Sequence, residues 1–160
     1  MSYRIGQGAD AHAFTAGDQV VLCGIRLPHE RGVLATSDGD VALHALCDAL
    51  LGAAALGDLG TFFPSDDPAW RGADSADLLR RVTARVAEAG LRLANADLTV
   101  ICQTPRLGPH REEMRGNVAR LLDVPVDAVS LKFTTTDGLG FTGRGEGLAA
   151  MAVVLLTHGN

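Results

Sequence analysis

Apolar and polar positions along this chain divide it into strand-like and helix-like segments. We predict five strands, each a short apolar segment bounded by turn-forming or polar residues, over residues 3–12, 19–27, 91–102, 130–136 and 148–156. We predict three helices, in which apolar residues recur every three to four positions, over residues 40–55, 75–89 and 109–122. Strands mixed with three long helices predict an α/β (α+β) sandwich, in which helices cover one face of a mixed sheet.

The helix expected over residues 40–55 is apolar on nearly every face, which indicates that it is deeply buried. Ser37 or Asp38 is placed to cap its start, and Gly57 is placed to end it. The following stretch, residues 60–72, is rich in Pro, Asp and Gly and predicts a loop.

Composition limits the class of protein. The 160 residues, 47% of them apolar, predict one globular domain over residues 1–160. The formal net charge of -5 argues against a nucleic-acid-binding surface. The longest apolar stretch, residues 42–56, is interrupted by His44, Asp48 and Gly52 and is too short to span a membrane.

The cysteines indicate the compartment. Cys23, Cys47 and Cys102 are odd in number and far apart, and no CxxC pair occurs. This usage is typical of reduced, buried thiols. Residues 1–8 lack the apolar core of a signal peptide. We therefore expect a cytoplasmic protein.

Two potential metal ligands, Asp10 and His12, lie two residues apart in the first predicted strand. Residues at this spacing face the same side of a strand, so their side chains project together. His44 is the best third ligand, because a helix made mostly of Ala, Leu and Val does not normally carry an imidazole. Asp40 and Asp48 lie four residues on either side of His44, where either could orient the ring.

This donor set leaves the metal open. Two histidines and one carboxylate suit catalytic zinc with a free fourth position, and they equally suit non-haem iron. From spacing alone, a hydrogen-bonded histidine of the core fits the pattern as well.

A glycine-rich segment follows the fourth predicted strand. Three threonines, residues 134–136, precede DGLGFTGRGEG at residues 137–147. Hydroxyl groups, flexible glycine backbone and Arg144 are the parts that hold a phosphate. A glycine-rich hairpin with an incidental ion pair is the structural alternative.

Taken together, these segments resemble the 2-C-methyl-D-erythritol 2,4-cyclodiphosphate synthase family of the non-mevalonate isoprenoid pathway. The order and spacing fit over essentially the whole length. The matching segments are GADAH at residues 8–12, SDGDVALHALCDALLGAAALGDLG at 37–60, FFPSDDP at 62–68, QTPRLGPH at 103–110 and TTTDGLGFTGRGEG at 134–147.

The resemblance implies a reaction. The substrate would be 4-diphosphocytidyl-2-C-methyl-D-erythritol 2-phosphate, whose 2-phosphate attacks the β-phosphorus of the cytidine diphosphate ester. CMP would leave and a cyclic diphosphate would form. Because the substrate carries its own nucleophile, the protein would supply positioning and charge neutralisation.

The resemblance also implies roles for single residues. Asp10, His12 and His44 would bind Zn²⁺. Asp137 would hold a second divalent cation, Mg²⁺ or Mn²⁺, at a position where the family has a glutamate. Thr135 matches a threonine that stabilises the transition state.

Substrate contacts are implied in several segments along the chain. Asp58 and Gly60 match contacts to the ribose, residues 102–108 match a loop that reads the cytosine, and Arg144 would hold phosphate. The complete set of substrate-binding residues implied by the resemblance is Asp10, Ala11, His12, Thr36, Ser37, Asp58, Leu59, Gly60, Phe63, Pro64, Ser65, Asp66, Asp67, Cys102, Gln103, Thr104, Pro105, Arg106, Leu107, Gly108, Thr134, Thr135, Thr136, Asp137, Phe141 and Arg144.

The resemblance further implies a homotrimer with each active site between neighbouring subunits. A central cavity would hold an isoprenoid diphosphate, with Phe141, Arg144 and Glu146 around it. Neither a nucleic acid nor a membrane is expected as a partner.

Besides Asp137, three positions depart from the family pattern. Thr36 stands where the family usually has a histidine that stabilises the transition state. Threonine donates a hydrogen bond but carries no positive charge, so we expect slower turnover or greater reliance on metal ions. Ala9 replaces a bulky aromatic residue, which would widen the central cavity, and Ser65 replaces a frequent aspartate.

Two alternatives remain open from the sequence. A non-haem iron oxygenase would use the same three ligands, but it predicts a β-rich jelly roll. A non-catalytic, zinc-stabilised trimer would bind isoprenoid diphosphates through Arg144, with Thr36 marking lost chemistry.

Overall fold

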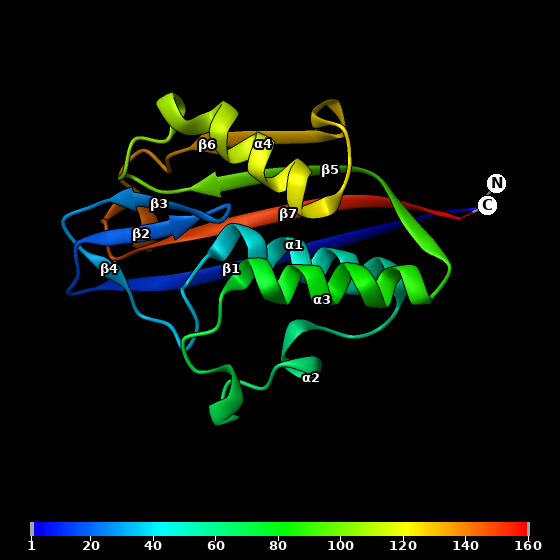
Figure 1. Ribbon diagram of the computed structural model, residues 1–160. Helices are drawn as coiled ribbons and strands as arrows, with labels where there is room; N and C mark the ends of the chain where they lie inside the picture. Colours follow the sequence, from blue (N-terminus) through cyan, green and yellow to red (C-terminus); the bar gives the residue numbers. More distant parts are fainter. Residues whose placement is uncertain (1, 160) are drawn as a thin grey trace.

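The computed structural model describes residues 2–159 and has a mixed five-stranded sheet with helices packed against it (Figure 1). The strand order is β4-β1-β7-β5-β6, where β5 and β6 are parallel and the other neighbours are antiparallel. These strands are β1 (Tyr3–Thr15), β4 (Gly32–Val33), β5 (Leu91–Ile101), β6 (Val129–Thr134) and β7 (Gly147–His158). The helices are α1 (Val41–Ala54), α2 (Leu59–Phe62), α3 (Ser75–Glu88), α4 (Arg111–Leu122) and α5 (Gly140–Gly143). The mixed sheet and the three long helices confirm the predicted fold class.

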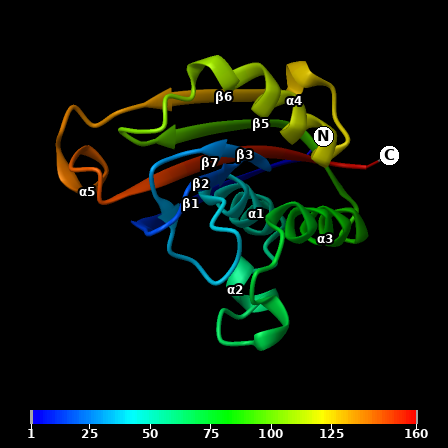
Figure 2. The same ribbon diagram turned by 60° about the vertical axis from the view of Figure 1, so that its left-hand side comes forward.

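The core lies between one face of the sheet and the long helices (Figure 2). Helix α1 packs on β1 and β7, α3 packs beside α1, and α4 lies over β6. Burial alternates along β7, as expected for a strand with one covered face. Leu148 and Val154 are buried, whereas Met151 and Val153 are each 45% exposed on the other face.

Helix α1 approaches β1 unusually closely, and two glycines make this possible. A Cβ atom on Gly6 would lie 1.8 Å from the carbonyl oxygen of Ala49, and one on Gly8 would lie 2.0 Å from that of Ala45. Eleven of the fourteen residues of α1 are buried, which confirms that this helix belongs to the core. The close contact brings Asp10 and His12 on β1 near His44 on α1.

The start of α1 differs from the prediction. Its N-cap is Asp40, not Ser37 or Asp38, and the Asp40 carboxylate accepts a hydrogen bond from Leu43 N at 3.0 Å. The same fully buried carboxylate accepts from Cys23 N at 3.1 Å and Gly24 N at 2.7 Å. Burial raises the pKa of Asp40 to about 6 despite these backbone donors. The helix ends at Ala54, and its C-cap is Ala55 in the left-handed conformation rather than the predicted Gly57.

One predicted strand is wrong. Residues 19–27 form a hairpin, β2 (Gln19–Leu22) and β3 (Ile25–Pro28), instead of one strand. The turn residues Cys23 and Gly24 have φ values of 53° and 75°, the two positive angles of a tight hairpin turn. Only one of them is glycine, which weakened the turn signal. The Asp40 carboxylate described above supplies the missing support by accepting both turn amides.

Smaller differences concern element ends. The first strand continues to Thr15, and α4 begins at Arg111 after a short 3-10 turn. The stretch 60–72 is not a plain loop, because it contains most of α2 and a 3-10 turn at Pro68–Trp70. All three cysteines are buried and free, as expected. Among the described residues no helix has the length and apolarity needed to cross a membrane.

Candidate active site

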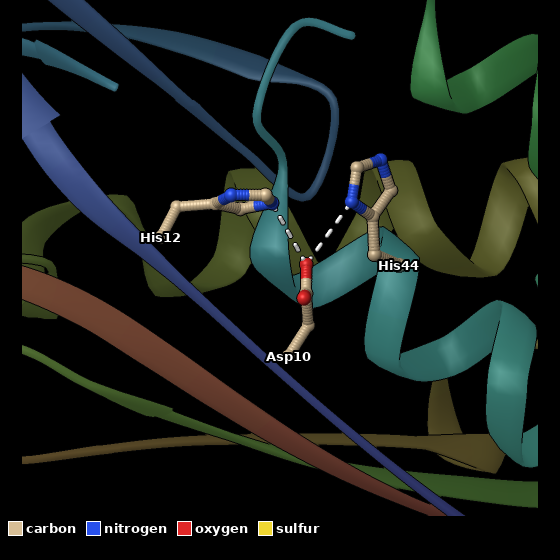
Figure 3. Close-up of side chains that lie close together, drawn as sticks. All are labelled: Asp10, His12 and His44. Atoms are coloured by element: carbon tan, nitrogen blue, oxygen red, sulfur yellow. Dashed lines mark hydrogen bonds and ion pairs between the residues drawn. The ribbon is translucent and has the colours of Figure 1, made fainter. Parts of the chain in front are cut away.

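Asp10, His12 and His44 converge where β1 passes under α1 (Figure 3). One carboxylate oxygen of Asp10 lies 3.1 Å from His12 Nε2 and 3.0 Å from His44 Nδ1. The potential ligand atoms of all three residues lie within 4.8 Å of one another. His44 therefore joins Asp10 and His12 as predicted, and the three candidate ligands face a common point.

The hydrogen bonding at this point is incomplete. His12 Nε2 is buried and has no hydrogen-bond partner of good geometry, although the Asp10 oxygen is near. An unpartnered buried ring nitrogen is costly, and a cation between the three groups would satisfy it. The residues present thus fit a bound metal ion better than a simple hydrogen-bonded core histidine.

The orientation of His44 is fixed from its other side. Its Nε2 lies 2.8 Å from Ser75 Oγ and 3.2 Å from Ser37 Oγ. Ser75 Oγ itself donates to the carboxylate of Asp38, so it is left to accept from His44 Nε2–H. With Nε2 protonated, Nδ1 faces the Asp10 carboxylate at 3.0 Å, where it carries a second proton or, once that proton is released, would bind a metal ion.

The structure therefore corrects the predicted orienting residue. Neither Asp40 nor Asp48 contacts the His44 ring: Asp40 caps α1, and Asp48 accepts from Leu59 N at 2.7 Å. Ser75 was missed. Its signal was a polar residue on the apolar stripe of α3, in line with Leu78 and Val82.

The pKa values of Asp10 and His44 depend on each other. Burial on its own raises the pKa of Asp10, but hydrogen bonds and charge from His12 and His44 outweigh it and hold that pKa well below its usual range. Burial lowers the pKa of His44, but the hydrogen bond and charge of Asp10 reverse this and raise it. The site therefore favours a negative carboxylate next to positive charge, which a proton or a metal ion supplies.

A cavity of about 270 Å³, which we call the metal-side cavity, opens beside these residues. Of the predicted substrate-binding residues, it is lined by Asp10, His12, Thr36, Ser37, Leu59, Gly60, Phe63 and Ser65. It also includes residues that sequence reasoning did not assign to substrate: His44, Asp48, Trp70 and Leu78.

Other residues predicted for this side lie away from the cavity wall. Ala11 is exposed and alternates with Asp10 and His12 along β1, so it faces the opposite side of the sheet. Asp58 caps α2 and Asp67 caps the 3-10 turn. Pro64 and Asp66 are not among the lining residues.

A second cavity, of about 470 Å³, lies at the ends of β5 and β6, and we call it the loop-side cavity. It is lined by Cys102, Gln103, Pro105, Arg106, Leu107, Gly108, Pro109, Phe133, Thr134 and Thr135, so it gathers most of the predicted cytosine loop with two threonines. Burial raises the pKa of Cys102 to about 11, so its sulfur is a thiol rather than a nucleophilic thiolate. Thr104 points elsewhere and bonds to His29 Nε2 at 3.0 Å. Sequence reasoning missed Pro109 and Phe133.

The remaining glycine-rich residues line neither cavity. Asp137 is exposed with a φ of 54°, and its amide bonds to Thr135 Oγ1 at 3.3 Å. Thr136 bonds to Thr142, and Arg144 forms an exposed ion pair with Glu146 at 2.9 Å. Phe141 is also exposed. Within one chain, the structure therefore does not bring these residues to the three-residue site.

Comparisons with known proteins agree with this geometry. Residues 3–157 match the family model described as the YgbB family. The chain is 60% identical to a 2-C-methyl-D-erythritol 2,4-cyclodiphosphate synthase from Alcanivorax borkumensis, over 98% of each chain. A solved synthase structure with bound CDP is 44% identical and superposes with a TM-score of 0.89, over 96% of this chain and all of the other. The bifunctional IspDF from Campylobacter jejuni gives 39% identity and a TM-score of 0.94, over 98% of this chain and 42% of that longer one.

The non-haem iron oxygenase required a β-rich jelly roll. The three long helices that pack on the sheet exclude that fold. The match of family model and relatives spans nearly the whole length, and it includes the segments that form both cavities. The chain therefore belongs to the YgbB family, the family of the 2-C-methyl-D-erythritol 2,4-cyclodiphosphate synthases.

Proposed function

We propose that this cyclodiphosphate synthase binds its cytidine diphosphate substrate across two cavities, with the methylerythritol end in the metal-side cavity and the cytidine in the loop-side cavity. The reaction of the family is the closure of 4-diphosphocytidyl-2-C-methyl-D-erythritol 2-phosphate to the 2,4-cyclodiphosphate in the non-mevalonate pathway. An oxygen of the 2-phosphate bonds to the β-phosphorus, the bond from that phosphorus to the bridging oxygen breaks, and CMP leaves with the electron pair. No nucleophile of the protein is needed.

The observation that carries this proposal is the meeting of Asp10, His12 and His44 at the mouth of a cavity. These residues would hold Zn²⁺, and the unpartnered Nε2 of His12 supports that assignment. A bound divalent cation supplies charge neutralisation and a template for the phosphate oxygens. Thr36, Ser37 and Ser65 present hydroxyl groups to the same cavity, where they orient the polyol phosphate by hydrogen bonds.

Thr134 and Thr135 take the corresponding part in the loop-side cavity. Their hydroxyl groups lie at the end of β6 beside the loop of residues 102–108. That loop presents backbone groups with which to read the cytosine edge. Asp137 follows Thr135 directly, and its exposed carboxylate would hold the second divalent cation, Mg²⁺ or Mn²⁺, against the diphosphate.

Assembly as a homotrimer would bring the two cavities together. The sheet face away from the helices exposes apolar side chains, with Ile5 at 73% and Met151 and Val153 at 45% each. Such a face favours association with copies of itself. Across the boundary, the metal-side cavity of one subunit would meet the loop-side cavity of its neighbour. An isoprenoid diphosphate would fit the central space, with its phosphates near Arg144.

CMP release tests the assignment of the metal residues. The zinc-loaded protein is incubated with the cytidyl substrate, with and without Mg²⁺, next to the variants His44→Ala and His158→Ala. We expect Mg²⁺-dependent CMP and cyclic diphosphate, lost in His44→Ala and kept in His158→Ala, whose exposed ring lies at the end of β7. A zinc-loaded wild-type protein that binds isoprenoid diphosphate but releases no CMP would favour the non-catalytic binding protein instead.

Subunit complementation tests the shared site. His44→Ala and Thr135→Ala chains, carrying different tags, are co-expressed and the mixed oligomers are isolated. We expect each variant alone to be inactive and the mixture to regain part of the activity, because one boundary then pairs an intact His44 with an intact Thr135. Inactive mixed oligomers would mean that both residues act within one chain.

A further inference from the structure

Two arginines on α3 contact the aromatic side chains of the segment that walls the metal-side cavity. The guanidinium of Arg85 lies 4.6 Å from the ring centre of Phe62, and that of Arg81 lies 5.5 Å from the ring centre of Trp70. Both distances are those of cation–π contacts. The two arginines are themselves exposed and do not line the metal-side cavity.

The aromatic side chains of residues 62–70, which we call the aromatic wall, lie between two hollows. Phe63 and Trp70 line the metal-side cavity, and they also line a hollow of about 320 Å³ on the other side, together with Arg81 and Arg85. The two rings meet edge to face, with centres 4.7 Å apart at an angle of 83°. Movement of either ring toward or away from α3 therefore changes the shape of the metal-side cavity.

Few hydrogen bonds join residues 59–72, the segment that carries the aromatic wall, to the rest of the described chain. Its ends are anchored, by Leu59 N bonding to Asp48 and Gly72 N bonding to the carbonyl of Thr36. Between these points, in the described structure, the hydrogen bonds of residues 61–71 all end within residues 58–73. The middle of the segment is held to the body of the protein by aromatic packing and by the two arginines.

We propose that Arg81 and Arg85 are positioning residues, which hold the aromatic wall of residues 62–70 against α3 and thereby keep the metal-side cavity in its substrate-binding shape. The inference rests on the proposed use of that cavity by the substrate. Neither arginine touches the reacting atoms. Each acts through a ring: Arg85 through Phe62, and Arg81 through Trp70 and its partner Phe63.

Trp70 is the only tryptophan of the chain, so its fluorescence reports the wall directly and without substrate. The variants Arg81→Gln, Arg85→Gln and the double variant are compared with Arg80→Gln. Arg80 lies on the same helix but pairs with Asp77 at 2.6 Å and contacts no ring in the described structure. We expect stronger acrylamide quenching of Trp70 in Arg81→Gln and in the double variant, and wild-type quenching in Arg80→Gln.

Kinetics then separate positioning from chemistry. A wall that is held in place less of the time reduces the fraction of binding-competent protein, so KM rises while kcat changes little. For the double variant we expect KM to rise about fivefold, given the strength of exposed cation–π contacts. Arg85→Lys keeps the positive charge over Phe62 and should restore part of the wild-type KM.

Each outcome bears on the proposal. Increased quenching with an unchanged KM would overturn the link between the wall and the substrate, whereas failure of the proposed use of the cavity would show separately, as CMP release that persists in His44→Ala. Unchanged quenching in the double variant would overturn the proposal that Arg81 and Arg85 hold the aromatic wall, whatever the kinetics. Thermal unfolding monitored by circular dichroism shows that the exposed variants are folded when these readings are taken.

Discussion

The hydroxyl of Ser75 lies 2.8 Å from Nε2 of His44, and both residues are buried. Because that hydroxyl donates to Asp38, it accepts the proton of Nε2, so Nδ1 is the ring nitrogen that faces Asp10. His44 is thus oriented as a candidate ligand by Ser37 and Asp38, which precede α1, and by Ser75 at the start of α3. Such outer contacts orient a ligand and thereby tune metal affinity.

Replacing Ser75 should weaken metal binding without removing a ligand. We expect Ser75→Ala to lower zinc affinity about 10- to 100-fold, because the His44 ring keeps only the more distant hydroxyl of Ser37 and is oriented less firmly. Competition with a chromophoric chelator measures this affinity. Thr83→Ala, on the same helix, removes a hydroxyl that bonds only to the Arg80 carbonyl and serves as the control. Equal zinc affinities for the two variants would contradict the role of Ser75.

Restoring the family histidine at position 36 should speed the reaction. Thr36 lines the metal-side cavity, within which a histidine side chain could face the reacting phosphates. A charged donor at this position should raise kcat about a hundredfold in Thr36→His. Thr36→Gln adds a larger donor without positive charge and should gain much less. An unchanged kcat in single-turnover CMP release would show that the metal ions already supply the neutralisation.

The buried carboxylate of Asp40 should matter to stability more than an ordinary helix cap. It accepts three backbone amides, from the hairpin turn and from the first turn of α1. Asp40→Ala leaves these donors unpaired and should lower the free energy of unfolding by about 3 kcal/mol. Asp74→Ala, which removes the exposed cap of α3, should lower it by about 1 kcal/mol. Urea unfolding of both variants compares them, and equal losses would refute the shared-cap explanation.

A methyl group between β1 and α1 should damage the fold and the site together. The Cβ of Gly8→Ala would lie 2.0 Å from the carbonyl oxygen of Ala45, so the helix must move away from the strand. We expect a loss of about 3 kcal/mol in stability and weaker zinc binding, because Asp10 and His44 separate. Gly116→Ala on α4, where nothing lies within 4 Å, should be neutral or stabilising. Wild-type zinc affinity in Gly8→Ala would argue that the site does not depend on this contact.

Sequence patterns predicted that Asp10, His12 and His44 would come together, because each carries a local signal. Asp10 and His12 share a strand face, and His44 interrupts an apolar helix. The signal of Ser75, a polar residue on the apolar stripe of α3, was weaker, since one serine on an amphipathic helix has many ordinary explanations. Its role depends on where the start of α3 meets α1, which only tertiary packing determines.

The hairpin at residues 19–28 was missed for a similar reason. A positive φ at Cys23 is unfavourable locally, and the carboxylate that stabilises the turn comes from Asp40, far along the chain. The separation of the two cavities was also beyond local patterns. The resemblance implied a substrate site between neighbouring subunits; within one chain the predicted residues that line a cavity fall into two separate cavities, and others, such as Asp58 and Asp137, line neither.

Because α1 packs closely on β1, the supply of a bound metal ion would affect how long the folded protein persists. The same helix fills the core and carries His44, so an ion bound there adds its binding free energy to that of folding. At a free ion concentration 100 times Kd, this linkage adds about 2.7 kcal/mol. Starvation for that ion would enlarge the unfolded fraction exposed to proteases, and the amount of enzyme would fall along with its loading.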